Sequence, residues 1–228
     1  MNPTLKQRWN KLLQDLKPMT FKQKVDHLWT YYYWVLIIIA VIVMLICIVS
    51  SSIKTLNTDV LIAGVLVNAD VSLEGHDFLE ERFFEKLGGI EGDQEVQISD
   101  VIFEDPFLTQ EIEYTHNATV KVLAMMSAQS VDYMIMDKMS MEFYLGQDIF
   151  IDLNELFSKE ELELWKDELI YLTYEDTGET IPVAINIGKT ALGQRYVNSE
   201  KERFIAFAVN TPRQDACKIF WEYIKTGE

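Results

Sequence analysis

Five polar residues with side chains suited to ligand binding follow hydrophobic runs of this sequence: Asn68, Asp70, Asp137, Lys138 and Asn186. The runs are rich in β-branched and aromatic residues, so each is expected to be a strand. In an open α/β sheet, ligands bind in the crevice outside the carboxyl ends of the strands. We therefore expect a ligand site here. The alternative is that these Asp and Asn residues only form turns and cap helices.

No metal site and no cofactor are expected. The two histidines beyond residue 54, His76 and His116, each have carboxylates nearby, but nothing fixes their separation, so solvated loop histidines are favoured. The acidic stretch 100–113 lacks the ordered D-x-D-x-D-G spacing of a calcium loop. A solvated acidic loop is the favoured interpretation of that stretch.

No catalytic residue is expected either. Gly188-Lys189-Thr190 matches the end of a phosphate-binding loop, but Val183 stands where that loop begins with glycine, so a turn is favoured. The motifs G-x-S-x-G and H-E-x-x-H do not occur, and Cys217 has no histidine near it in sequence, which favours a buried structural thiol. The chain is therefore predicted not to be an enzyme, and a surface hydrolase is the least favoured function.

Charge and cysteine content exclude several classes of protein. The 228 residues include 36 acidic and 20 basic side chains, and the net charge of −16 disfavours nucleic acid as the main partner because phosphate is repelled. Two cysteines are too few for a disulfide scaffold or a Cys₄ metal site.

A long uncharged stretch, residues 28–53, stands apart from the rest of the sequence. A bilayer core requires about 20 apolar helical residues, so we predict a transmembrane helix at 28–53. Aromatic rings settle at the membrane interface, and five such residues precede the aliphatic run: Trp29, Tyr31, Tyr32, Tyr33 and Trp34. Cleavage as a signal peptide is the alternative, but a basic region of some 30 residues before the apolar run favours an uncleaved signal anchor.

The charges on the two sides of residues 28–53 predict the orientation. Residues 1–53 carry six basic and two acidic side chains, a net charge of +4, whereas the remainder has a net charge of −20. Basic residues stay on the cytoplasmic side, so we expect a single-pass protein of the cell membrane with residues 54–228 outside the cell. Residues 1–27 form a basic amphipathic segment, which either lies on the lipid bilayer or is a short solvated helix.

Hydrophobic patterning after residue 54 alternates between strands and helices. Strands are expected at 59–67, 96–103, 131–136, 171–174, 180–187 and 204–209, with a hairpin turn at 176–178. A capping box at Ser158 and Glu161 and a second one at Thr211 and Gln214 each predict the start of a helix. This order indicates a three-layer α/β sandwich with a mainly parallel, mixed sheet in a single domain, 54–228.

Several segments resemble bacterial extracellular solute-binding proteins. The sequence from Lys121 to Asp137 is similar to that family's helix, small residue, Asp and following strand, and Gly146 to Leu153 is similar to its G-x-hydrophobic-x-D-L stretch. Residues 181–183 resemble the strand that enters the hinge, and residues 207–210 with 215–224 resemble the return strand and closing helix of the first lobe. The resemblance implies the fold of one lobe of such a protein.

One departure from that family affects the expected function. Only 21 residues separate Pro182 from Phe204, where the family inserts a complete second lobe. We therefore predict a membrane-anchored extracytoplasmic binding module that is not catalytic and binds a small ligand or a protein partner. The alternative is an accessory or structural subunit of a membrane transporter or assembly complex, whose outer domain is an interaction surface.

Overall fold

The computed structural model describes residues 18, 20, 22, 29, 33–35, 37–48, 59–90, 93–103, 112–198 and 200–228, with the side chains of 112–116 outside this description. The chain divides into two compact units, Met1–Asn57 and Thr58–Glu228, and each is considered by itself. The predicted segment 1–27 lies outside the description except for Pro18, Thr20 and Lys22. Of the predicted interface aromatics, Tyr31 and Tyr32 also lie outside it.

The described part of the first unit corrects the predicted membrane span. No helix among the described residues is both long enough and apolar enough to cross a membrane. The prediction of a transmembrane helix at 28–53, and with it of a single-pass signal anchor and a cell-membrane location, is therefore wrong.

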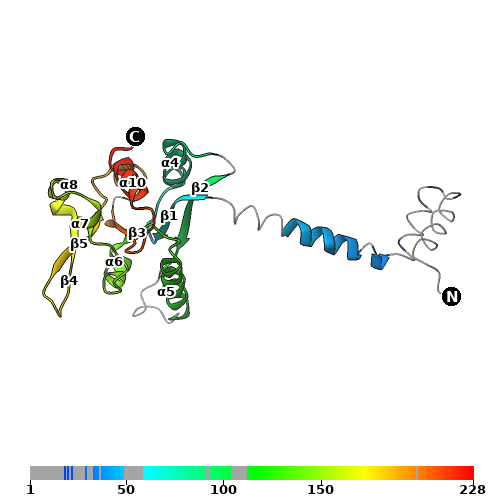
Figure 1. Ribbon diagram of the computed structural model, residues 1–228, viewed down its shortest axis with the longest axis horizontal. Coiled ribbons are helices and arrows are strands. Elements are labelled where there is room, and N and C mark those ends of the chain that lie inside the picture. Colours follow the sequence, from blue (N-terminus) through cyan, green and yellow to red (C-terminus); the bar gives the residue numbers. More distant parts are fainter. Residues whose placement is uncertain are drawn as a thin grey trace. The chain divides into compact units, whose positions relative to one another are not determined.

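The second unit is built on one six-stranded sheet with the order β2-β1-β3-β6-β5-β4 (Figure 1). The strands are β1 (Asp59–Val67), β2 (Gln94–Val101), β3 (Tyr133–Asp137), β4 (Leu169–Thr173), β5 (Thr180–Asn186) and β6 (Arg203–Phe207). Strand β1 is parallel to β2 and β3, whereas the pairs β3 with β6, β6 with β5 and β5 with β4 are antiparallel. The predicted α/β class is confirmed, but the sheet is mixed and not mainly parallel.

The strand directions bring several chain segments to one end of the sheet. Because β6 runs against both β3 and β5, strand β5 has the same direction as β1, β2 and β3. The carboxyl ends of these four strands therefore share one edge with the amino end of β6. We call this the carboxyl edge of the sheet.

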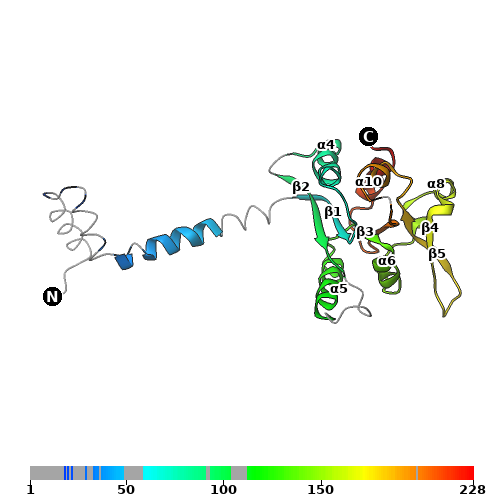
Figure 2. The ribbon, with the colours of Figure 1, turned by 180° about the vertical axis from the view of Figure 1, so that it is seen from behind.

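Helices cover both faces of the sheet, as Figures 1 and 2 show for α4 and α10 on one side and α5 and α6 on the other. Alternate residues of β3 belong to the two resulting cores, Tyr133 and Ile135 to one and Met134 and Met136 to the other. The helices are α3 (Leu73–Asp77), η1 (Phe78–Arg82), α4 (Phe83–Lys86), α5 (Ile112–Ser127), α6 (Lys138–Leu145), α7 (Leu153–Leu156), α8 (Lys159–Leu164), η2 (Lys166–Glu168), α9 (Ala191–Arg195) and α10 (Gln214–Thr226).

Two of the predicted local signals have different outcomes. The capping box of Ser158 and Glu161 at α8 is confirmed, with both reciprocal hydrogen bonds present. The predicted N-cap at Thr211 is wrong, because α10 begins at Gln214 and Arg213 occupies the cap position. The Thr211 hydroxyl accepts a 3.0 Å hydrogen bond from the Arg213 backbone N–H and donates a 2.5 Å hydrogen bond to the buried Asp132 carboxylate, so it has a long-range partner as well as a local one.

Candidate functional site

The carboxyl edge brings together all five residues that the sequence suggested for ligand binding. Asn68 and Asp70 follow β1, Asp137 ends β3, Lys138 begins α6, and Asn186 ends β5. Their common placement follows from the shared direction of β1, β3 and β5. Ligand binding by these residues stays a prediction.

Asn68 connects the ends of β1 and β2 through its side-chain amide. Its Oδ1 accepts a 3.0 Å hydrogen bond from the Phe103 backbone N–H, and its Nδ2 donates to the Phe103 carbonyl at 2.6 Å. The same Nδ2 lies 3.5 Å from Asp137 Oδ2. The other oxygen of Asp137 accepts from the Ser140 backbone N–H at 2.9 Å and so caps α6. These two side chains therefore have a structural role at the edge, as the alternative interpretation expected.

A buried arginine that the sequence did not suggest anchors the next part of the edge. Arg203 is only 3% exposed, and its Nε donates a 2.7 Å hydrogen bond to the Ala69 carbonyl. Its Nη2 lies 3.7 Å from Asp70 Oδ2, which also accepts a 3.2 Å hydrogen bond from Asn198 Nδ2. A buried guanidinium requires such partners to offset its desolvation. The sequence signal was a cation placed directly before the apolar run 204–209.

The backbone at the end of β1 adopts an uncommon conformation twice within three residues. Asn68 and Asp70 have φ angles of 50° and 54°, in the left-handed region. Asn and Asp enter this region at lower cost than other L-residues do. Such conformations persist where surrounding contacts hold them, and here the contacts are the Phe103 and Arg203 hydrogen bonds.

Two adjoining hollows open at the carboxyl edge and share Asn186 and Glu202 as lining residues. The first has a volume of about 320 Å³ and lies between the end of β5, α9 and residues 197–198 and 200–203. The second has a volume of about 400 Å³ and lies between α6, β4 and the start of β6. We call these two the edge hollows. Their volumes fall in the range of small-molecule sites.

The second edge hollow combines apolar side chains with an excess of carboxylates. Apolar lining comes from Met141, Leu145, Ile170 and Phe204, and charged lining comes from Glu142, Asp167, Glu168, Glu202 and Lys138. Lys138 Nζ lies 3.6 Å from Glu202 Oε2, and Lys189 pairs with Glu168. That pairing raises the pKa of Lys189 above its ordinary value, mainly through the hydrogen bond to Glu168. Within the described part of the chain, Glu142 and Asp167 form no ion pair, so the hollow retains negative charge.

The segment Gly188-Lys189-Thr190 has a structural role in the loop before α9. Thr190 is buried, and its Oγ1 caps α9 by accepting a 3.1 Å hydrogen bond from the Gly193 backbone N–H. Gly193 itself permits this close turn, because a Cβ there would lie 2.0 Å from the Ile187 carbonyl oxygen. The turn favoured by the sequence is therefore the arrangement observed.

Metal-ligating side chains do not gather in the described residues. No group of three or more His, Cys, Asp or Glu side chains is placed there to hold a metal ion. His76 Nε2 lies 3.8 Å from Asp100 Oδ1, and the side chain of His116 lies outside the description. Cys217 is fully buried, as expected from the sequence, and this burial raises the pKa of its thiol to about 12.

Comparison with known proteins gives no match to a family model, to a curated protein or to a solved structure. The resemblance to solute-binding proteins therefore stays a prediction from the sequence.

Proposed function

We propose that the domain Thr58–Glu228 is a binding module, without catalytic activity, that takes a small amine-bearing ligand in the edge hollows. The observation that carries this proposal is the position of Glu202 and Asn186, which line both hollows. A ligand that occupies either hollow meets one carboxylate and one amide at the boundary between them. Carboxylate and amide oxygens are the acceptors that an ammonium group needs.

The lining of the second hollow supports a ligand that is cationic and partly apolar. Glu142 and Asp167 supply carboxylates without ion-pair partners in the described residues, and Met141 and Phe204 supply apolar contact. An alkylamine satisfies both, because its chain covers apolar surface while its ammonium group stays near the carboxylates. An anion of the same size could make the apolar contacts, but the carboxylates would repel it.

The absence of an inserted second lobe implies weak binding. In the family that the sequence resembles, the ligand lies between two lobes, and residues 183–203 of this chain leave room for none. A ligand on a single lobe keeps much of its surface in water and forgoes part of the burial that favours binding. We expect a dissociation constant on the order of a millimolar, which corresponds to about −4 kcal/mol.

A thermal unfolding experiment on the full chain tests the proposal. Butylamine and 1,4-diaminobutane should raise the Tm, because a ligand that binds only the folded state stabilises it by mass action. Butyrate, of similar size and opposite charge, should not. The rise should be lost in Glu202→Gln and kept in Glu175→Gln, since Glu175 lies in the exposed β4–β5 turn. Equal rises with butylamine and butyrate, or a full rise in Glu202→Gln, would contradict the proposal.

A further inference from the structure

Strand β2 is one of the two edge strands of the sheet, and in the described part of the chain its outer side faces no other strand. Its pairing with β1 is continuous along β2 from Gln94 to Val101. An edge strand presents backbone N–H and C=O groups that can pair with another chain. The hydrogen bonds at the two ends of β2 show which of its residues present these groups to the open side.

The carbonyl groups of Asp93 and Val101 point toward β1. Asp93 accepts from the Asp59 backbone N–H at 2.8 Å, and Val101 accepts from the Asn68 backbone N–H at 3.2 Å. Backbone groups alternate in direction along a strand, so every second residue between these two also faces β1. The N–H and C=O groups of Val96 and Ile98 therefore point to the open side. The side chains of the same two residues pack on the core face that α4 covers.

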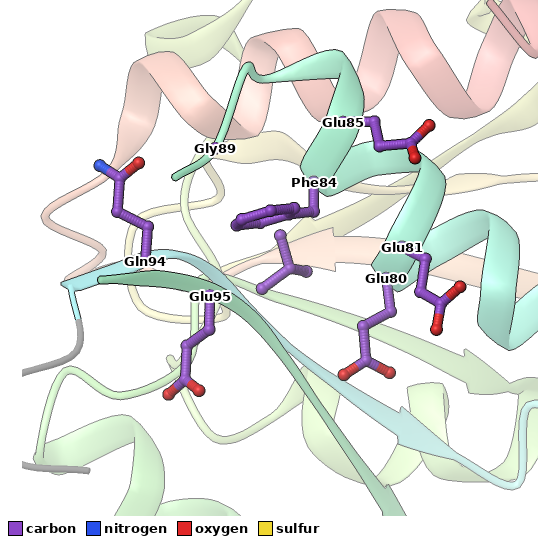
Figure 3. A pocket seen from close by; sticks show the side chains of 8 residues that line it. Glu80, Glu81, Phe84, Glu85, Gly89, Gln94 and Glu95 are labelled. Carbon is purple, nitrogen blue, oxygen red and sulfur yellow. The ribbon is translucent and has the colours of Figure 1, made fainter. Parts of the chain in front are cut away.

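A groove lies directly beside this open edge, between β2 and the helical segment η1–α4, as Figure 3 shows. Its volume is about 530 Å³, and Phe84 and Val96 form its apolar floor. Gly89 passes close over the Phe84 ring, where a Cβ would lie 2.3 Å from a ring carbon. The groove is therefore shaped to accept an apolar side chain next to an unpaired strand.

Carboxylates surround this groove, and none of the described residues that line it is basic. They belong to Glu80, Glu81, Glu85 and Glu95, and Figure 3 shows the first three on the helical wall and Glu95 on β2. Asp77 raises the pKa of Glu81 above its ordinary value by hydrogen bonding and repulsion, and Glu80 and Glu85 add to the repulsion. A bound cation would relieve this repulsion. We call the groove with its four glutamates the acidic groove.

We propose that β2 accepts an extended segment of a partner protein as an added strand, with an apolar side chain in the acidic groove and basic side chains beside the glutamates. Main-chain hydrogen bonds supply affinity in this mode of recognition, and the side-chain positions supply specificity. The negative charge of the groove favours a partner with basic side chains. It disfavours a second copy of this chain, because pairing of two β2 strands would bring Glu95 of one copy near the same glutamates of the other. This surface lies outside the edge hollows and goes beyond the ligand binding proposed above.

Synthetic peptides test this proposal on the full chain. The probe is fluorescein-labelled Lys-Thr-Val-Thr-Lys-Thr, in which lysine, valine and lysine share one face of an extended strand. Fluorescence anisotropy should show saturable binding that weakens with added salt, because the exposed charge pairs are screened. The matched peptide with glutamate in place of lysine should bind about tenfold more weakly or not at all. N-methylation of the central valine should also cost about tenfold, because it removes one strand hydrogen bond and keeps the charge.

Variants of the protein distinguish binding by the glutamates of the acidic groove from attraction by the overall negative charge of the chain. The double variant Glu81→Gln, Glu85→Gln should bind the basic peptide about tenfold more weakly. The matched variant Glu175→Gln, Glu179→Gln removes the same charge from the β4–β5 turn and should bind normally. Glu202→Gln should also bind the peptide normally. A failure of the strand-addition proposal can therefore be distinguished from a failure of the proposed ligand binding in the edge hollows.

Three results would overturn the proposal. The first is no binding of the basic peptide at millimolar concentration, which would mean that the glutamates only keep other strands away from the edge. The second is equal binding of the N-methylated peptide, and the third is a dimer of the full chain that the Glu81→Gln, Glu85→Gln variant strengthens.

Discussion

Gly64 of β1 lies against the ring of Tyr133 on the neighbouring strand β3, so closely that a Cβ on Gly64 would lie 2.2 Å from Tyr133 Cζ. Tyr133 is fully buried and stacks on Phe220 of α10 with ring centroids 4.0 Å apart. Burial raises the pKa of its hydroxyl, which keeps it neutral over the ordinary pH range. The absence of a side chain at Gly64 thus makes room for the ring that joins the sheet to α10.

Gly64→Ala should destabilise the domain because the added methyl group has no space beside the Tyr133 ring. Overpacking of a rigid core typically costs about 1–3 kcal/mol, and a contact of this length favours the upper end. The change is measured as a lower urea midpoint at an unchanged m-value. Gly146→Ala is the matched control, because nothing lies within 4 Å of its Cβ position, and it should change stability by less than about 0.5 kcal/mol. Equal effects of the two substitutions would contradict this account.

Asp132→Asn should cost about 1–3 kcal/mol, because it removes the negative charge of a fully buried carboxylate and weakens the hydrogen bonds that this group accepts. The Asp132 carboxylate accepts from the Ala63 backbone N–H at 2.7 Å and from Arg213 Nη1 at 2.9 Å. Asp215→Asn is the control, since Asp215 is exposed and its nitrogen–oxygen distance to Lys218 is 4.0 Å. That change should be nearly neutral, as exposed pairs generally are. Similar urea midpoints for the two variants would show that the buried network contributes little.

Local sequence patterns predicted the elements of the sheet well. The apolar run 59–67 coincides with β1, and the expected strand 180–187 differs from β5 (Thr180–Asn186) by one residue. Continuous burial on both faces requires an apolar residue at every position, and this leaves a clear signal in the sequence. The grouping of Asn68, Asp137 and Asn186 at one edge followed from the expectation that these strands are parallel, since Asn68 directly follows β1 and the other two residues end β3 and β5.

Strand direction and long-range pairing were not predictable in this way. The run 204–209 shows that β6 is buried but not that it runs against β3 and β5, and this reversal makes the sheet mixed. Arg203 and Ala69 are 134 residues apart, and Thr211 and Asp132 are 79 apart. Their contacts exist only once the sheet has formed. The capping pattern at Thr211 therefore predicted a helix start at that residue, and it gave no sign of the distant Asp132 carboxylate that the hydroxyl also binds.

Cys217 should be unreactive in the folded protein and reactive after unfolding. Its raised pKa of about 12 leaves almost no thiolate at pH 8, and the side chain is inaccessible. Ellman's reagent should therefore label one thiol rapidly, the exposed Cys47, and the second only in denaturant. A Cys47→Ser variant should show no rapid labelling. Rapid labelling of that variant at pH 8 would contradict the buried placement.

The raised pKa of Cys217 also sets the direction of a pH effect on stability. A pKa of about 12 in the folded protein, against the ordinary thiol value of 9.0, means that folding favours the protonated thiol. Its contribution is complete below pH 9 and is lost as the pH rises toward 12. The pKa of Tyr223 is also raised to about 12, so its contribution to the stability of the domain is lost over an overlapping pH range. Urea midpoints measured from pH 8 to 11 should fall, and a flat profile would contradict both shifts.

Gln129 and Asn68 share a left-handed backbone, with φ angles of 54° and 50°, yet replacement by glycine should have opposite effects at the two positions. Gln129 follows α5, where the Ser130 N–H bonds to the Met125 carbonyl at 3.0 Å and closes the helix end. Glycine is the preferred residue there, so Gln129→Gly should stabilise the domain by about 1 kcal/mol.

Asn68→Gly gains less relief of backbone strain, because Asn enters the left-handed region at lower cost than Gln does, and it loses both hydrogen bonds to Phe103. Two lost side-chain hydrogen bonds cost about 1–3 kcal/mol together, which exceeds this gain. Urea unfolding of the two variants beside the unchanged chain measures both effects. If Asn68→Gly were as stabilising as Gln129→Gly, the Asn68 amide would not hold β1 and β2 together at the carboxyl edge, and its side chain would be free to serve a ligand.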